Sequence, residues 1–345
     1  NGKQTYAIFM DFSKAFDKVS HNKLVYKLEK ILGNDQLIKW ISAYLKNREQ
    51  FVDFNNHSSH RVSVDSGVPQ GYVLGPLLFI LYIKDIVNGI PVNIRLYADD
   101  CVIYSEIESS KDQVLLNESF NRVVSWCEAW RMSINFEKTV YMSISHKKNK
   151  LNFQYFTNNA ILSEVQSYKY LGLWITNNLN WTKHIDIVTS KANQKLFFLR
   201  RTLKLSLPSV RVLAYKPIVL PILDYAAVIW DPFTQTNIHK VEKVQRRAVR
   251  FIYDSYRQTS VNELLVRANL LSLSERNRIS RLTYLYQIIN GHYKIDIGKI
   301  ISFSSGYVTK QRHDRTITPF RTRNNCFKYS FFPRTVQNWN SLNNH

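Results

Sequence analysis

The sequence predicts an α+β protein built in two parts, and three observations support this prediction. Short segments rich in β-branched and aromatic residues alternate with helical patterns up to about Trp181. Beyond Trp181 strand patterns become rare and basic helical patterns dominate. The 345 residues, 45% of them hydrophobic, suffice for a real core and suggest two or three domains.

The elements of the first part follow from hydrophobic spacing. Leu24, Leu28 and Ile31 recur at helical intervals, and Gly33 is a natural helix stop. The break from Gly67 to Gly71 separates a pair of strands from the next helix. In order, we predict a strand at 6–12, helices at 21–32 and 36–46, strands at 50–54 and 61–64, a helix at 74–86, two strands joined at Asp99-Asp100, a helix at 111–130, and strands near 139–144 and 168–175.

The second part is predicted to be mostly helical. The helices are expected at 182–203, at 208–230 with interruptions at Pro217 and Pro221, at 236–252 and at 274–290. The last forty residues are basic and are expected to be rich in loops. From residue 240 onward there are 19 Lys and Arg against 6 Asp and Glu, which gives +13 of the total charge.

Net charge is the strongest compositional signal. The formal charge of +21 favours a polyanionic partner, of which nucleic acid is the foremost. A membrane surface ranks behind it, because no polybasic amphipathic helix stands apart from the fold and runs such as 74–83 are too short to span a bilayer. We expect the helices beyond Trp181 to hold the nucleic-acid backbone, although their basic residues do not all share one helical face: Lys240, Lys243, Arg246, Arg247 and Arg250.

Cysteine usage and the start of the chain give two further expectations. Cys101, Cys127 and Cys326 are far apart in sequence and form neither a ligand cluster nor a disulfide framework, which fits a reducing compartment. The chain begins with Asn1, has no initiator Met and enters a strand at once. We therefore expect it to be part of a longer protein.

Two adjacent acids, Asp99 and Asp100, stand between two hydrophobic runs. The simple interpretation is a tight turn, where Asp is common. The alternative includes Asp11, which ends a predicted strand 88 residues before Asp99. If those strands are neighbours, three carboxylates meet, and such a cluster requires neutralisation, for which Mg²⁺ or Mn²⁺ is suited. Two ions about 4 Å apart hold the attacking and leaving oxygens of a phosphoryl transfer in line.

Five segments stand in the order of reverse transcriptase motifs A to E. They are FMDFSKAFDKV (9–19), GVPQGYVLGPLLF (67–79), YADD (97–100), WRMSINFEKT (130–139) and YKYLGLWIT (168–176). The chain resembles a reverse transcriptase of a metazoan non-LTR, LINE-type retrotransposon. VQRRAVRFIYD (244–254) and SFFPRTVQNWNSL (330–342) resemble the region that follows the polymerase in jockey-like and related elements.

The resemblance implies a role for each matching residue. Asp11 and Asp99 match the metal-binding acids, and Asp100 matches the second acid of the YADD turn, which is usually less directly engaged with metal. Phe16 matches the ring beneath the incoming sugar that excludes a 2′-hydroxyl. Gln70 and Gly71 match the nucleotide contact, Lys138 matches the motif D lysine near the departing pyrophosphate, and Leu171-Gly172 matches the primer grip. Without the family, the simpler interpretations would be a core residue for Phe16, a turn at Gln70-Gly71, a surface lysine at Lys138 and a bend in a strand at Leu171-Gly172.

The resemblance also implies domains, an activity and partners. We expect a right-hand polymerase palm at 1–178, a helical thumb or connection at 179–255 and a basic C-terminal domain at 256–345, with the fingers missing upstream. The implied activity is RNA-directed DNA polymerisation, in which two Mg²⁺ or Mn²⁺ ions assist transfer of a nucleotide from a dNTP to a primer 3′-OH. The implied partners are an RNA template, a DNA primer and the dNTP, with no membrane, in the cytoplasm and nucleus.

Two departures from the family pattern qualify this expectation. Tyr72 stands where the family commonly has a small residue, which puts nucleotide positioning in doubt. Without the upstream fingers, we expect this fragment alone to be inactive. The alternative is a truncated, catalytically silent relic of a retroelement that only binds nucleic acid.

Overall fold

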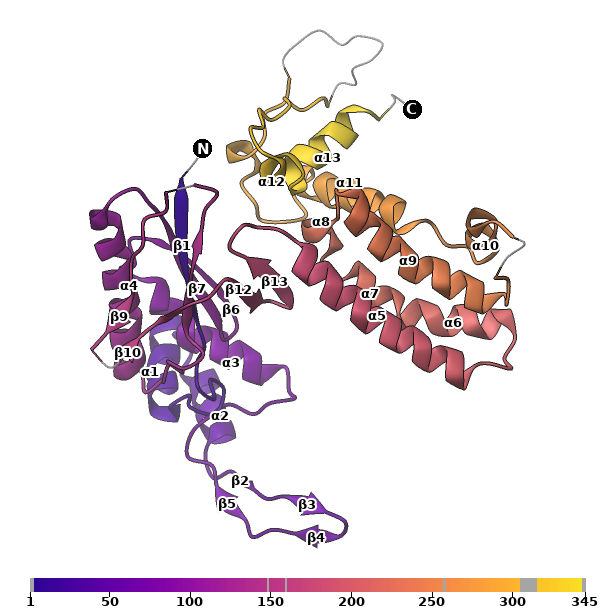
Figure 1. The fold of residues 1–345 in the computed structure, drawn as a ribbon. Coiled ribbons are helices and arrows are strands. Elements are labelled where there is room, and N and C mark those ends of the chain that lie inside the picture. The colour runs from indigo at the N-terminus through magenta and orange to yellow at the C-terminus, as the bar shows by residue number, and fades with distance from the viewer. Residues whose placement is uncertain (1–2, 148, 159, 257–258, 305–314, 343–345) are drawn as a thin grey trace. The chain divides into compact units, whose positions relative to one another are not determined.

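The structure, a computed structural model, describes residues 3–147, 149–158, 160–256, 259–304 and 315–342. It contains both a β-sheet and many helices, which confirms the predicted α+β class. The chain divides into two compact units (Figure 1). The first comprises residues 1–172 and 176–178, and the second comprises residues 173–175 and 179–345. None of the described helices is both long enough and apolar enough to cross a bilayer.

The first unit is built on a five-stranded sheet in the order β11-β8-β1-β7-β6 (Figure 1). Strand β1 is central and runs antiparallel to both of its neighbours, β7 and β8. Their register pairs Met10 with Cys101 and Phe9 with Val102 on one side, and Phe9 with Val140 on the other. The strands are β1 (Gln4–Met10), β6 (Asn93–Tyr97), β7 (Asp100–Ile107), β8 (Val140–Ile144) and β11 (Ser163–Glu164).

Four helices complete the core of this unit. They are α1 (His21–Leu32), α2 (Asp35–Leu45), α3 (Leu74–Ile83) and α4 (Ser110–Ala129), and a 3₁₀ turn, η1 (Lys84–Val87), follows α3. The even-numbered side chains of β1, Tyr6, Ile8 and Met10, belong to one buried cluster with residues of these helices. Helix α1 has the predicted bounds, and its stop is Gly33, whose φ of 55° needs a residue tolerant of the left-handed region.

A hairpin arm connects α2 to the loop before α3. It contains four two-residue strands, β2 (Glu49–Gln50), β3 (Asp53–Phe54), β4 (His57–Ser58) and β5 (Val62–Ser63), and it projects from the rest of the unit (Figure 1). Every residue from 49 to 63 is exposed. The strands predicted at 50–54 and 61–64 are therefore shorter than expected, because no second layer packs on their hydrophobic residues.

Lys27 on α1 is buried inside the first unit. Its ammonium group donates to the carbonyl of Tyr82, pairs with the Asp85 carboxylate and lies 3.6 Å from the ring centroid of Trp130. Burial lowers the pKa of this ammonium group. The carboxylate and the aromatic ring compensate for the desolvation of the cation and tie α1 to α3 and α4.

The second unit is mostly helical, and two hydrophobic clusters lie within its described residues. The larger cluster takes side chains from α5, α6, α7, α8, α9 and α10, and the smaller one takes them from α11 and α13. The helices are α5 (Thr182–Thr202), α6 (Pro208–Ile218), α7 (Leu220–Asp224), α8 (Ala227–Trp230), α9 (Gln235–Ile252), α10 (Val261–Arg267), α11 (Leu273–Ile289), α12 (Asn325–Lys328) and α13 (Phe331–Asn340), with a 3₁₀ turn η2 (Ile297–Lys299). The short strands β9 (Phe156–Thr157), β10 (Ala160–Ile161), β12 (Ser167–Tyr170) and β13 (Leu173–Thr176) lie before α5.

Two helix predictions need correction. The segment 208–230 forms three helices, and the breaks fall at Val219 and at Tyr225-Ala226, where Ala226 is left-handed with φ of 51°. Pro217 lies inside α6, so the break at Val219 comes two residues after the proline. The last forty residues contain α13 in addition to loops.

Asp231 joins three segments of the second unit. Its carboxylate is paired with Arg281 of α11 at 2.6 Å and with Arg334 of α13 at 3.0 Å. Asn277 donates to the same carboxylate at 2.8 Å. The side chains of Asp231 and Arg281 are only 6% and 4% exposed. One buried acid therefore binds two cations and connects the end of α8 to α11 and α13.

Candidate active site

The sheet register brings two of the predicted acids together. In β1 and β7 Met10 lies across from Cys101, so the next residue of each strand, Asp11 and Asp100, continues that register at the ends of the strands. Both are half-buried. Partial burial raises the pKa of the Asp100 carboxyl, and the negative charges of Asp99 and Asp11 raise it further. These shifts indicate that the acids repel one another at short range.

The turn between β6 and β7 differs by one residue from the predicted one. Tyr97 pairs with Asp100, so the loop residues are Ala98 and Asp99, and Asp100 already belongs to β7. Ala98 has φ of 51°, and this left-handed conformation allows a two-residue loop. Asp99 is exposed at the tip, whereas Asp100 is half-buried and is held by its pairing with Tyr97, one position beyond the Met10–Cys101 pair that leads to Asp11.

A layer of aromatic rings lies on the same face of the sheet as the acid pair. Odd-numbered residues of β1 face away from the buried cluster, and among them the ring of Phe9 stacks on Tyr168 with centroids 4.4 Å apart. Tyr170 packs against the same ring at 5.7 Å. Burial raises the pKa of Tyr168, and the charges of Asp11 and Asp100 raise it further. Neither tyrosine is among the predicted site residues, although their i, i+2 spacing in a strand already places them on one face.

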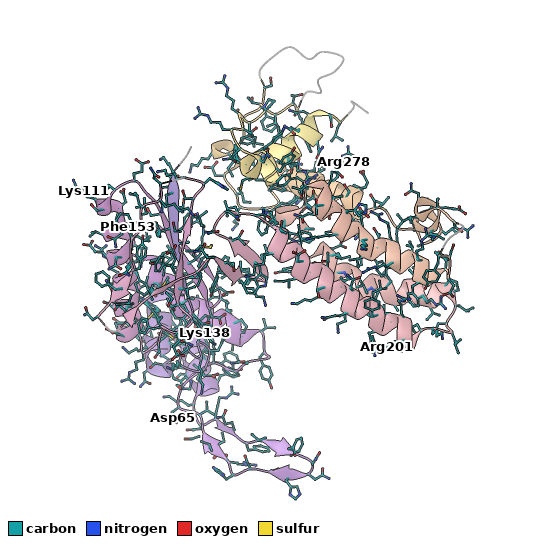
Figure 2. All side chains as sticks on the ribbon, in the orientation of Figure 1. Asp65, Lys111, Lys138, Phe153, Arg201 and Arg278 are labelled. Atoms are coloured by element: carbon teal, nitrogen blue, oxygen red, sulfur yellow. The ribbon has the colours of Figure 1, made fainter. Side chains whose placement is uncertain are left out.

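The segment after α4 holds the end of β1 in place. The amide of Asp11 donates to the hydroxyl of Thr139 at 3.2 Å, and its carbonyl accepts from the amide of Asn135 at 2.8 Å. Lys138 lies between these two partners in sequence, and its exposed side chain is labelled in Figure 2. The backbone that carries the predicted lysine is therefore tied directly to the backbone of the predicted metal-binding acid.

The motif B loop lies against motif A. The Gln70 amide donates to the Asp17 carboxylate at 3.1 Å, and the amide of Val68 donates to the Phe16 carbonyl at 2.9 Å. Gly67 has φ of 91°, and a Cβ there would lie 2.9 Å from the Cα of Asp17, so only glycine fits this approach. The ring of Phe16 stacks on Phe79 of α3 with centroids 4.4 Å apart and is half-buried against the core.

A hollow with a volume of about 540 Å³ lies between the motif B loop and the base of the arm. Gly71 follows Gln70 with φ of 85°, and the ring of Tyr72 is 67% exposed at the rim. Polar and charged side chains dominate the wall, among them Lys14, Asp17, Arg48, Gln50, Ser63 and Gln70. The hollow is therefore suited to a polar ligand.

The acids fit a hard divalent cation as a pair. No group of three or more His, Cys, Asp or Glu side chains within the described ranges is arranged as a metal site. Mg²⁺, however, usually keeps several waters and takes one or two protein carboxylates together with substrate phosphates. Asp11 and Asp100 supply two carboxylates on one face, and their mutual repulsion would be relieved by a cation.

Several of the predicted nucleic-acid contacts on α9 are engaged within the second unit. Lys240 pairs with Asp186 at 2.5 Å, and Arg247 donates to the Asn193 side chain at 3.1 Å. Arg250 donates to the carbonyls of Ser255 and Thr259. Arg246 is within 3.4 Å of a ring nitrogen of His239, and Lys243 is exposed. In the predicted primer grip, Leu171 and Gly172 both have positive φ, 47° and 82°, so the chain turns sharply there.

Comparisons with known proteins agree with the motif resemblance. Residues 1–175 match the family described as reverse transcriptase (RNA-dependent DNA polymerase). The RNA-directed DNA polymerase from the mobile element jockey of Drosophila melanogaster is 27% identical over 265 residues, which cover 73% of this chain and 29% of that protein. The probable RNA-directed DNA polymerase from transposon BS of the same species is 28% identical over 294 residues, or 81% of this chain and 32% of that protein.

The chain spans about a third of the length of these curated relatives. Among solved structures, apo telomerase from Candida tropicalis gives a TM-score of 0.44 at 14% identity, covering 83% of this chain and 46% of that one. A likeness at this level supports no conclusion about the fold. The family match and the two relatives confirm the resemblance that the motifs predict.

Proposed function

The chain belongs to the family of reverse transcriptases (RNA-dependent DNA polymerases), and from this premise we propose that it performs RNA-directed DNA synthesis of the kind named for its jockey and BS relatives. The single observation that carries the proposal is the position of Asp11 across from Asp100, beside the Asp99 turn. Three acids at one end of a sheet repel one another, and such an unfavourable cluster of negative charge is typical of a functional site that binds a cation.

The proposed reaction is nucleotidyl transfer. The 3′-oxygen of the primer attacks the α-phosphorus of the dNTP, the new P–O bond forms, and the bond from that phosphorus to the pyrophosphate oxygen breaks. Asp11, Asp99 and Asp100 would hold two Mg²⁺ or Mn²⁺ ions, with Asp11 and Asp100 as the opposed pair. When bound, the ions stabilise the attacking and leaving oxygens in line.

Other residues near the acids would position the substrates. Lys138 is exposed on a segment bonded to the Asp11 backbone, and its ammonium would neutralise or protonate the departing pyrophosphate. The nucleotide would enter the polar hollow at Gln70 and Gly71, with Phe16 as the ring beneath the sugar. The Leu171-Gly172 bend would receive the primer end.

We propose the same domain assignment as the motifs imply. Residues 1–178 would form the polymerase palm, 179–255 a helical thumb, and 256–345 a basic C-terminal domain, acting on an RNA template, a DNA primer and a dNTP. Side chains of α10 and the start of α11 share the hydrophobic cluster of α5 to α9, so the proposed thumb would extend past residue 255.

Primer extension on an RNA template tests the proposal. The chain is assayed with Mg²⁺ and dNTPs beside Asp11→Asn and Asp100→Asn, and binding of the template–primer is measured in parallel. Each substitution keeps the side-chain shape and removes a ligand charge, so extension should fall at least about 100-fold while binding changes little. Asp53→Asn is the control, because Asp53 is an exposed residue of the arm.

The outcomes separate the candidate functions. Extension that survives Asp100→Asn at the parent rate would show that the acid pair is only a strand end beside a turn. A parent chain that binds template–primer and extends nothing, even at high Mg²⁺, would favour the relic that only binds nucleic acid. Binding that stays constant between low and physiological salt would exclude phosphate contacts as its basis.

A further inference from the structure

Helix α2 carries a stacked aromatic pair, the exposed Trp40 and the half-buried Tyr44. The indole of Trp40 is 56% exposed, and it stacks on Tyr44 with centroids 5.9 Å apart and planes 12° from parallel. These residues are one helical turn apart, so they lie on the same side of α2. Neither is among the buried residues of the unit's core, although Tyr44 packs against it. An indole that is more than half exposed and is held by stacking on a second ring offers aromatic surface to a ligand.

A guanidinium continues this pair toward the polar hollow. The Arg48 group lies 5.4 Å from the ring centroid of Tyr44, and Arg48 also lines the hollow beside Gln50 and Gln70. Trp40, Tyr44 and Arg48, here called the stacking ladder, therefore form one path that leads from the exposed side of α2 to the hollow. All three belong to the first unit.

The chemistry of the ladder selects a class of ligand. Aromatic rings and guanidinium planes bind unpaired nucleobases by stacking, and the cation adds attraction to the phosphate backbone. Between residues 35 and 48 the charge is favourable as well, with Lys39, Lys46 and Arg48 against the single acid Asp35. The ladder ends at a hollow lined largely by polar and charged side chains, which suits the phosphates and sugars of such a strand.

We propose that the stacking ladder binds an unpaired polynucleotide strand and directs it to the hollow at Gln70. The bases stack on Trp40 and Tyr44, and Arg48 contacts the phosphate where the strand reaches the hollow. The inference rests on the proposed function only in identifying that strand as the template ahead of the primer. Stacking itself requires no catalysis and no divalent ion.

Binding measurements in EDTA test the ladder apart from the polymerase activity. The probe is a single-stranded oligonucleotide containing 2-aminopurine, and the comparison is a blunt duplex of the same sequence. Loss of one stacking platform typically costs 1–3 kcal/mol, so Trp40→Ala should weaken single-strand binding about 5- to 160-fold. Trp40→Phe should retain most of the affinity, and duplex binding should change less than about twofold.

A matched control is available on α1. Tyr26 is 49% exposed and has the Lys30 ammonium 4.2 Å from its ring centroid, so it is an aromatic–cation pair outside the ladder. Tyr26→Ala should leave both affinities unchanged. Arg48→Lys keeps the charge and loses the planar group, and it should lower single-strand affinity less than Arg48→Gln does.

Three results would overturn the inference. The first is a Trp40→Ala chain that binds the single strand within about twofold of the parent, as expected if a protein covers this face. The second is an equal loss for single strand and duplex, which would assign the effect to charge. The third is an equal loss in Tyr26→Ala. Because extension is not measured, none of these depends on whether the Asp11–Asp100 pair is catalytic.

Discussion

Replacing the buried Asp231 with Asn should destabilise the second unit more than the same replacement of a partly exposed acid. Asp231 compensates the buried Arg281 and the largely buried Arg334 at once, and it also accepts from Asn277. The substitution keeps the volume and some hydrogen bonding. It leaves two guanidinium groups without a counter-ion, and burial already lowers the pKa of Arg281 to about 10.

The magnitude follows from the burial of this group. Removing one partner of a buried ion pair costs about 3–5 kcal/mol, since the remaining charge stays desolvated. At 1.36 kcal/mol for each factor of ten, the opening of α11 and α13 should become about 160- to 5,000-fold more frequent. Asp224→Asn is the matched control. Asp224 pairs with Arg276 of the same α11, but both side chains are 33% exposed, so the expected cost is at most about 1 kcal/mol.

Hydrogen exchange followed by mass spectrometry is the suitable assay, because peptides report each helix separately. Peptides from 273–289 and 331–340 should lose protection in Asp231→Asn, whereas peptides from β1 and α4 in the first unit should exchange at the parent rate. If α11 and α13 keep their protection within about fivefold of the parent, Asp231 does not hold these segments together and the reasoning is refuted.

Three further predictions concern the acids, the buried lysine and a buried histidine. Asp100→Asn should raise the melting temperature at neutral pH without divalent ions, because the raised pKa of Asp100 means that its ionised form is unfavourable in the fold; the gain should vanish at acidic pH, where Asp100 is protonated. Asp53→Asn is the control, and an unchanged melting curve for Asp100→Asn would contradict the prediction. Lys27→Ala should cost about 2–5 kcal/mol in urea unfolding, because it leaves a cavity where the buried side chain packs beside Trp130 and removes the cation that pairs with the partly exposed Asp85. Lys30→Ala on the same helix, over the Tyr26 ring, should cost less than about 1 kcal/mol, and equal losses would argue against the role of the buried lysine. Burial lowers the pKa of His184 from 6.5 to about 4, so the stability that the neutral imidazole contributes is complete above pH 6.5 and is lost as the pH falls toward 4. The urea midpoint of the parent should drop across this window and the midpoint of His184→Gln should drop less, whereas parallel pH curves for the two proteins would refute this role of His184.

Local signals account for the parts of the fold that were predicted well. The glycine at position 33 and the Asn34 side chain, which accepts from the Leu37 amide at 3.0 Å, define the junction of α1 and α2 within a few residues. The strand before Asp11 was predicted because the hydrophobic run ends there, and β1 ends one residue earlier, at Met10. Its pairing with β7 was only a hypothesis, because a hydrophobic run does not indicate its partner strand. The exact bounds of the YADD turn were not predicted, because a left-handed Ala98 is uncommon and the acids pointed to a loop one residue later.

The rest of the candidate site depends on packing between distant segments. Tyr168 meets Phe9 across about 160 residues of sequence, and no spacing within either segment indicates that contact. The partners of the basic residues on α9 were likewise hidden, because Asp186 and Asn193 come from another helix, α5. The breaks between α6, α7 and α8 depend on backbone angles at Val219 and Ala226 that the prolines alone do not fix.

The position of β1 at the centre of the sheet makes the number of residues before Asp11 as important as their identity. Side chains alternate between the two faces, so removing a single residue from Gln4–Met10 while the pairing is kept would turn the acid toward the buried cluster and bring Met10 to the opposite face, where Phe9 now stacks on Tyr168. Conservative exchanges within the strand are tolerated by comparison, since they leave the alternation intact. In this segment a one-codon deletion should therefore be more damaging than several hydrophobic substitutions together.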